Sequence, residues 1–99
     1  MFAVVRETTY DPDKLSRGQA EMNEFAALLI RQPGYAGVVG VDARDGRTLT
    51  VTLWESEEQA EAARAVLEPE AQRLLAPLST VPSRLITQGP VIRTDLAKS

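Results

Sequence analysis

The stretch GYAGVVGVDARDGRTLTVTLWESEEQAEAA, residues 34–63, decides the fold of this chain. Its first part, Tyr35–Ala43, is rich in valine and favours a β-strand. The Asp45–Gly46 pair that follows favours a two-residue type I′ hairpin turn. Arg47–Trp54 is then expected to return as the partner strand, ending at the only tryptophan. Ser56 with Gln59 three residues later forms a capping box, so a helix is expected to begin there.

A two-residue turn at this position would place Ala43 opposite Thr48 and Val39 opposite Thr52. Because side chains alternate along a strand, the hairpin then has two distinct faces. One face is expected to hold Val38, Leu49, Val51 and Leu53, and the other Val39, Val41, Thr48, Thr50, Thr52 and Trp54. Neither set is typical of a face exposed to bulk water, so both faces are expected to be covered.

The N-terminal third predicts a strand over Phe2–Tyr10, followed by a helix capped by Asp11. Proline at the first helical position fits this start, since its missing N–H costs nothing there. Apolar residues then recur at helical spacing through Arg31, with Gly18 as a weak point in the second turn. Gln32–Pro33–Gly34 is expected to stop the helix.

The C-terminal third continues the helix that opens at Ser56, with an expected kink or break at Glu68–Pro69. A short helix should resume from Pro69 and end before Pro77. The residues Leu78–Ser83 are expected to form a loop, and Arg84–Ile92 the last strand.

The predicted order is strand–helix–strand twice, which is the split βαβ arrangement of a ferredoxin-like α+β fold. A chain of 99 residues sustains one core, so residues 1–99 are expected to form a single domain. A four-stranded sheet with both helices on one face leaves an apolar face open. We expect a second copy to cover it, as a homodimer packed sheet face to sheet face.

The composition excludes several classes of function. Without cysteine or histidine, the chain has no disulfide, no thiolate or imidazole metal site and no histidine base. A net charge of −3 with interspersed signs argues against nucleic-acid binding. No segment approaches the ~20 apolar residues of a membrane span, and the N-terminus does not read as a secretory signal. The expectation is a cytoplasmic protein that does not enter a membrane.

Three segments carry a resemblance to a known family: Pro33–Gly34–Tyr35, the Asp45–Gly46 turn, and Leu53–Trp54–Glu55–Ser56–Glu57–Glu58. With the order of elements, they make the chain resemble the antibiotic biosynthesis monooxygenase-type domains of the dimeric α/β-barrel superfamily. The resemblance implies a homodimer and a pocket between helices and sheet. It also implies an oxygenase that needs no cofactor and no metal.

The resemblance also locates departures from the family's polar residues. Cofactor-free oxygenases of this group carry an asparagine four residues before the tryptophan, where this chain has Thr50. A threonine offers one hydroxyl in place of an amide with both donors and an acceptor. Haem-degrading relatives place a histidine ten residues after the tryptophan, where this chain has Arg64, and an asparagine in strand one, where it has Arg6 and Glu7. Haem breakdown by that route is therefore not expected.

The resemblance and the residues together suggest a candidate substrate-binding set: Trp54, Thr50, Arg64, Tyr35 and Glu7. Trp54 either walls a pocket for a flat aromatic ligand or packs in the core. Arg64 either holds an anionic or phenolate oxygen or lies in solvent on a helix face. Tyr35 either bonds a ligand or anchors a strand end. Glu7 either assists proton transfer or forms an interface ion pair, and only one of Arg6 and Glu7 can face the helices.

Two hypotheses about function follow. The first is a cofactor-independent monooxygenase acting on a small phenol- or anthrone-like aromatic substrate, in which no residue is assigned as catalytic. The second is a non-catalytic dimeric protein that binds a small apolar or aromatic ligand or serves as an accessory subunit.

Overall fold

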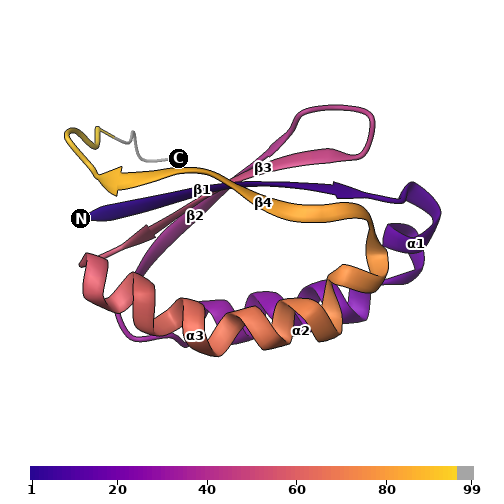
Figure 1. Cartoon of the computed structure of the whole chain (residues 1–99), viewed down its shortest axis with the longest axis horizontal. Helices are drawn as coiled ribbons and strands as arrows, with labels where there is room; N and C mark the ends of the chain where they lie inside the picture. Colours follow the sequence, from indigo (N-terminus) through magenta and orange to yellow (C-terminus); the bar gives the residue numbers. More distant parts are fainter. Residues whose placement is uncertain (96–99) are drawn as a thin grey trace.

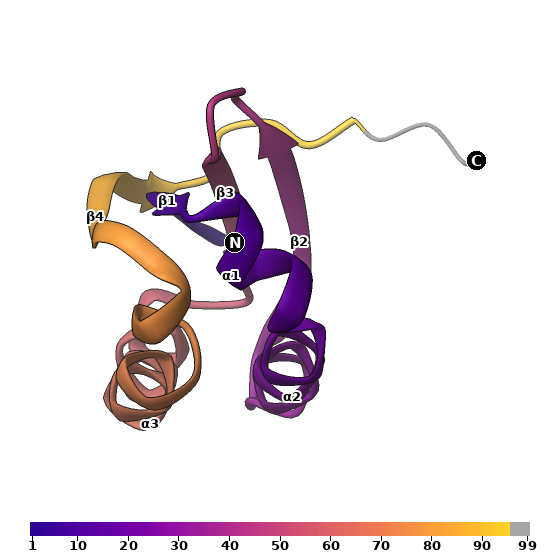
Figure 2. The same cartoon turned by 90° about the vertical axis from the view of Figure 1, so that its right-hand side faces the viewer.

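The computed structural model describes residues 1–95 of the chain. Four antiparallel strands form one sheet in the order β2-β3-β1-β4, and helices pack against one of its faces (Figures 1 and 2). This is the ferredoxin-like βαββαβ arrangement expected from the sequence. The strands are β1 (Phe2–Tyr10), β2 (Tyr35–Asp42), β3 (Arg47–Trp54) and β4 (Ser79–Pro90), and the helices are α1 (Pro12–Arg17), α2 (Gln19–Ile30), α3 (Glu57–Leu74) and the 3-10 turn η1 (Ala76–Leu78).

The core at one end of the molecule forms where β1 and β3 meet α3. Phe2 and Trp54 are directly opposite each other in the two central strands, and both are buried. They pack against the small side chains Ala60 and Ala63 and against Leu67 of α3. Alternation from this pair outward sets which residues of both strands face the helices.

A second buried group lies at the opposite end of the sheet. Tyr10 at the end of β1 is buried, as are Leu74 at the end of α3 and Leu78 in η1. Gly18 is also buried here, and a Cβ at this position would lie 2.6 Å from Cδ2 of Leu78. The expected helix over residues 12–31 is in fact interrupted at Gly18, and the close approach of Leu78 explains why no larger residue stands there.

The register of the β2–β3 hairpin differs by one residue from the prediction. Asp45 and Gly46 have positive φ as expected, but so does Arg44. The loop is therefore one residue longer, and Asp42, not Ala43, is opposite Thr48. The Asp42 carboxylate accepts a hydrogen bond of 2.8 Å from the Arg44 N–H, which helps a non-glycine residue adopt this conformation.

The shift changes which side chains share a face. Val39 is paired with Val51 and Val41 with Leu49, so these valines lie on the face away from the helices. Their expected placement with the threonines is wrong. Val38 is opposite Thr52 on the helix side instead. The outer face of this hairpin is consequently more uniformly aliphatic than the sequence suggested.

Two further expectations for the C-terminal third are corrected. Helix α3 is continuous through Pro69, because Leu67 before the proline and Leu74 after it are both buried and hold the two halves in line. The predicted short helix starting at Pro69 is therefore part of α3. Strand β4 begins at Ser79, well before the predicted start at Arg84, and reaches β1 through three register shifts along its length. Within residues 1–95 no helix is long and apolar enough to cross a bilayer.

The buried phenol of Tyr10 predicts a loss of stability at alkaline pH. Burial raises the pKa of Tyr10 above its ordinary value, and the Thr8 hydroxyl opposes this shift in part. The unfolded state therefore releases this proton at lower pH than the folded state does. The contribution to stability is present below pH ~10 and is lost as the pH rises through the folded-state pKa.

We expect the free energy of unfolding of the wild type to fall between about pH 9 and pH 11, bracketing the ordinary tyrosine pKa, and to fall less in Tyr10→Phe. Urea unfolding at both pH values measures this difference, with Tyr35→Phe as the matched control. Equal pH dependence in the wild type and in Tyr10→Phe would contradict the assignment.

Candidate functional site: the space between sheet and helices

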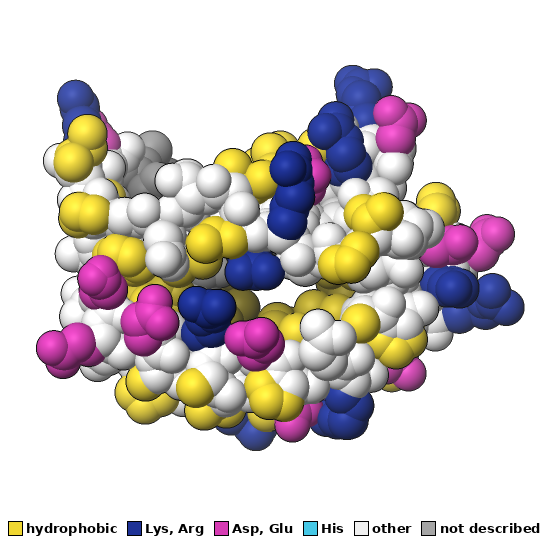
Figure 3. All heavy atoms as spheres, in the orientation of Figure 1, with side chains coloured by type: hydrophobic (Ala, Val, Ile, Leu, Met, Phe, Trp, Pro, Cys, Tyr) yellow, Lys and Arg dark blue, Asp and Glu magenta, His cyan; other side chains and the backbone are white. Residues whose placement is uncertain are grey.

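The two buried groups leave the middle of the helix-facing sheet surface incompletely covered. Figure 3 shows a hollow between the sheet layer and the helix layer, with charged side chains at its rim. None of the helix-facing residues of β1 and β3 between the two ends is buried: Val4, Arg6, Thr8, Thr48, Thr50 and Thr52 are all partly accessible. We call this space the cleft. It lies where the sequence resemblance places a ligand pocket.

Aromatic side chains close one end of the cleft. Trp54 and Tyr35 pack edge to face, with ring centroids 6.1 Å apart and planes at 81°. This contact arises because β2 bulges between Tyr35 and Gly37, which brings Tyr35 opposite Trp54. Trp54 is only 4% exposed and contacts the core residues of α3. Its first role is therefore core packing, and Tyr35 anchors it from the start of β2.

Thr50 lies on the floor of the cleft, four residues before Trp54. At ~3.3 Å per residue the two are separated by about 13 Å along the strand. Across the sheet, Thr50 is flanked by Gly40 of β2 and Arg6 of β1. A Cβ built at Gly40 meets no heavy atom within 4 Å, so the space directly above Gly40 is open. Thr50 and Trp54 thus line one elongated space rather than touching the same small group.

The structure places Arg64 outside the cleft. Its side chain is 60% exposed on α3 and forms ion pairs with Glu61 at 3.9 Å and Glu68 at 3.5 Å. These are contacts along one helix surface, which contribute little in water. The solvent-exposed interpretation of Arg64 is the one that the structure supports.

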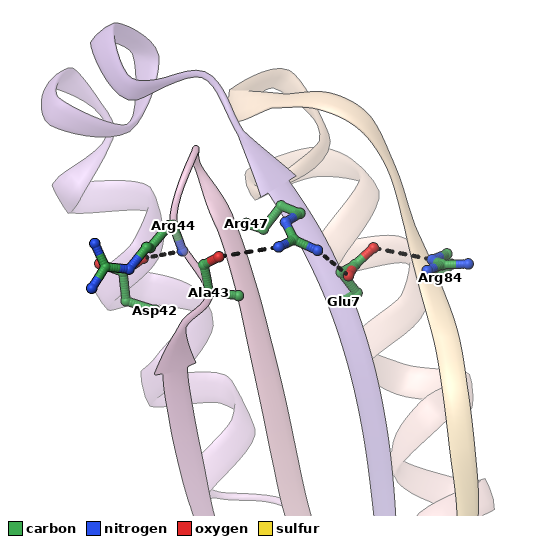
Figure 4. A network of polar contacts seen from close by, with 6 residues as sticks. All are labelled: Glu7, Asp42, Ala43, Arg44, Arg47 and Arg84. Atoms are coloured by element: carbon green, nitrogen blue, oxygen red, sulfur yellow. Dashed lines mark hydrogen bonds and ion pairs between the residues drawn. The ribbon is translucent and has the colours of Figure 1, made fainter.

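Glu7 lies on the opposite face of the sheet from Trp54 and Thr50. Its side chain is 16% exposed, and its carboxylate is bridged by two guanidinium groups, from Arg47 at 3.6 Å and Arg84 at 3.1 Å. Figure 4 shows the three side chains on the face away from the helices, joining β3, β1 and β4. The prediction that Glu7 lies in the cleft is wrong. Because side chains alternate along β1, Glu7 faces away from the helices and its neighbour Arg6 faces them.

Arg6 is therefore a residue that the candidate set missed. Its Nε donates a hydrogen bond of 3.1 Å to Oγ of Ser83 in β4. The alternation rule limited the choice to Arg6 or Glu7, but the sequence does not say which of them shares a face with Trp54. That was decided by the pairing of Phe2 with Trp54, which puts even-numbered β1 residues on the helix side.

Two shallow grooves occur at the ends of the molecule, and neither contains a residue of the candidate set. One, of about 310 Å³, is lined by residues of α1, α2, α3 and η1, and the other, of about 280 Å³, lies beside Phe2 and Ser56. Among residues 1–95, no three acidic side chains gather in a way that would hold a metal ion.

Comparison of the whole chain with known proteins bears on the fold. No protein-family model matches the chain, and no curated protein matches it by sequence. Solved structures do match. SnoaB, a cofactor-independent oxygenase from Streptomyces nogalater, has a TM-score of 0.72 at 22% identity over 94% of both chains.

Two other solved structures agree with this one. A protein of unknown function from Nitrosomonas europaea has a TM-score of 0.77 at 10% identity over 99% of this chain and 95% of its own. An antibiotic biosynthesis monooxygenase has a TM-score of 0.74 at 12% identity over 94% of this chain and 100% of its own. Identities this low establish the fold alone. The chain has the fold of the antibiotic biosynthesis monooxygenase domains, as the sequence resemblance implied.

The contrast between Trp54 and Arg64 predicts different effects on stability. Trp54→Ala removes a buried indole and should lower the free energy of unfolding by about 3–5 kcal/mol. Arg64→Ala should change it by no more than about 0.5 kcal/mol, because its ion pairs are exposed. Urea unfolding at one fixed protein concentration measures both. A small effect of Trp54→Ala would contradict its assignment to the core.

Proposed function

We propose that the protein is a cofactor-independent monooxygenase that oxidises a small phenol- or anthrone-like aromatic substrate in the cleft. The observation that carries this proposal is the cleft itself: an incompletely filled space with an aromatic wall at Trp54 and Tyr35 and a floor of threonine hydroxyls. A flat ring system suits its length, and hydroxyls can bond a ring oxygen. The shared fold with a cofactor-independent oxygenase adds support.

The proposed reaction requires few catalytic groups from the protein. An anthrone loses a proton to give an electron-rich enolate, which transfers an electron to dioxygen and then combines with it. The resulting peroxide loses water, so one ring CH₂ and one O₂ become one C=O and one H₂O. In this scheme the threonines orient the substrate oxygen, and the wall and helices exclude water from the intermediates. No histidine base is needed if the substrate itself is acidic.

A ligand-binding or accessory role without chemistry is the alternative. It is favoured by the exposure of Arg64 and the outward direction of Glu7, which remove two polar groups from the candidate site. The two functions differ in whether oxygen is consumed.

The test is oxygen uptake with anthrone in chelator-treated buffer, corrected for the protein-free reaction. We expect protein-dependent uptake and, under ¹⁸O₂, one labelled oxygen in the quinone. Thr50→Val should lower kcat/KM about 10-fold, the effect of losing one hydrogen bond to the reacting substrate. Thr87→Val makes the same change on the opposite sheet face and should leave kcat/KM unchanged.

Uptake that does not exceed the protein-free rate across a panel of phenols and anthrones would reject the oxygenase and leave the ligand-binding alternative. Uptake without label in the product would show that dioxygen serves only as an electron acceptor.

We also propose that two copies associate through the outer sheet face. One row across all four strands on this face reads Val39, Val51, Val5 and Thr87. Val39 is 48% exposed and Val41 is 46% exposed, so aliphatic side chains on this face meet solvent in the single chain. Such a surface is typical of an interface, and a two-fold related copy would present the same surface in return.

Light scattering tests the association. We expect the wild type near twice 10.8 kDa and Val39→Lys near 10.8 kDa, because a lysine there would bury an unpaired charge in the interface. Val66→Lys is the matched control, since Val66 is similarly exposed on α3 and should remain dimeric. A monomeric wild type at micromolar concentration would refute the proposal.

A further inference from the structure

Arg6 stands apart from the other basic residues of the chain. Among the lysines and arginines within residues 1–95, Arg6 is the one whose residue is partly buried, and the others are exposed. It lies on the helix-facing side of β1, between Thr50 of β3 and Leu85 of β4. Arg6 is therefore one of the residues that form the floor of the cleft.

The contacts of Arg6 leave much of its donor capacity unused. Nε donates to Oγ of Ser83 at 3.1 Å, and Nη2 approaches the Ser83 carbonyl oxygen at 3.5 Å. Both contacts are on one edge of the guanidinium plane. The other edge, formed by Nη1 and Nη2, has no hydrogen-bond acceptor within residues 1–95. Ser83 thus fixes the plane of the group while leaving the end-on edge free.

No carboxylate in the described part of the chain forms an ion pair with Arg6. The adjacent residue shows the opposite situation, since Glu7 on the other face has two arginine partners. On α3, Glu61 and Glu68 are paired with Arg64. The fold therefore places one positive charge on the cleft side of the sheet, and no acidic group within residues 1–95 forms an ion pair with it.

We propose that the ligand of the cleft is an aromatic carboxylate, whose carboxylate group binds the free edge of Arg6. A planar guanidinium with two parallel N–H groups matches a carboxylate in a bidentate pair. The aromatic part of the ligand would extend along the threonine floor toward Trp54, about 13 Å from Thr50 along β3. This inference rests on the cleft being the ligand site of the proposed function, and it narrows the substrate to aromatic compounds that carry an anionic group.

The experiment compares two probes of nearly equal shape, 1-naphthoate and the neutral 1-naphthamide. Dissociation constants come from ¹H–¹⁵N NMR titration of the labelled wild type. We expect naphthoate to bind at least 10-fold more tightly than naphthamide, with shifts at the Thr50 and Gly40 amides and at the Arg6 Nε–H. Raising the salt concentration should reduce the difference, because the cleft is open to solvent.

Variants separate the charge from the fold. Arg6→Met should remove the preference for naphthoate while still binding both probes weakly, and Arg6→Lys should retain part of it because the charge remains without the planar fork. Arg64→Met is the matched control and should keep the wild-type preference. The NMR spectrum of each free variant verifies that it is folded, and Arg6→Lys keeps the test informative if Arg6→Met does not fold.

Equal affinity for the two probes, absence of binding by both, an unchanged preference in folded Arg6→Met, or shifts confined to the outer sheet face would each overturn the inference. Its failure is distinguishable from that of the proposed oxygenase. A protein that prefers naphthoate through Arg6 but consumes no oxygen supports this inference and rejects the oxygenase. A protein that consumes oxygen but shows no preference for naphthoate supports the oxygenase and rejects this inference.

Discussion

The pairing of Phe2 with Trp54 across the two central strands is the constraint on which the rest of the structure depends. Both aromatic side chains are buried against the small residues of α3, so the face of the sheet that carries them must meet the helices. Strand alternation then assigns every other residue of β1 and β3 to one side or the other. The cleft, the aliphatic outer face and the opposite directions of Arg6 and Glu7 all follow from that one contact.

The core is divided between the two ends of the sheet, and this division creates the site. Large side chains meet at Trp54 on one end and at Tyr10, Leu74 and Leu78 on the other. Between them the floor carries threonines and Gly40, which are too small to reach the helices. A domain of this size buries less apolar surface when it leaves such a space unfilled. An unfilled space of this kind fits a ligand-binding site.

The charged residues of the sheet are arranged differently on its two faces. On the outer face, Glu7 joins Arg47 and Arg84 across three strands, which places a compensated polar group at the edge of an aliphatic surface. On the helix side, Arg6 is held in place by Ser83 and has no acidic partner among residues 1–95. The first arrangement suits an interface between copies, and the second suits an anionic ligand.

Local signals were enough to predict most elements of the fold. The bounds of β1 and β3 were predicted as they occur, and the caps at Asp11 and Ser56 form the expected hydrogen bonds. The errors occurred where a distant contact or a side chain overrode a local preference. Arg44 adopts positive φ because Asp42 bonds its N–H, and α3 passes through Pro69 because buried leucines hold both halves.

The sequence by itself determined the order of elements, the alternating faces of β3 and the absence of histidine and cysteine chemistry, because these depend only on residue type and spacing. The tertiary structure alone decided that Arg6 and not Glu7 faces the cleft, that Arg64 lies in solvent, and that the space between the two buried ends stays open. Those facts depend on which residues far apart in the chain meet, and no local pattern of residues encodes that. The stretch from Gly34 to Ala63 specifies a hairpin and a helix, but only Phe2 shows which side of the hairpin is inside.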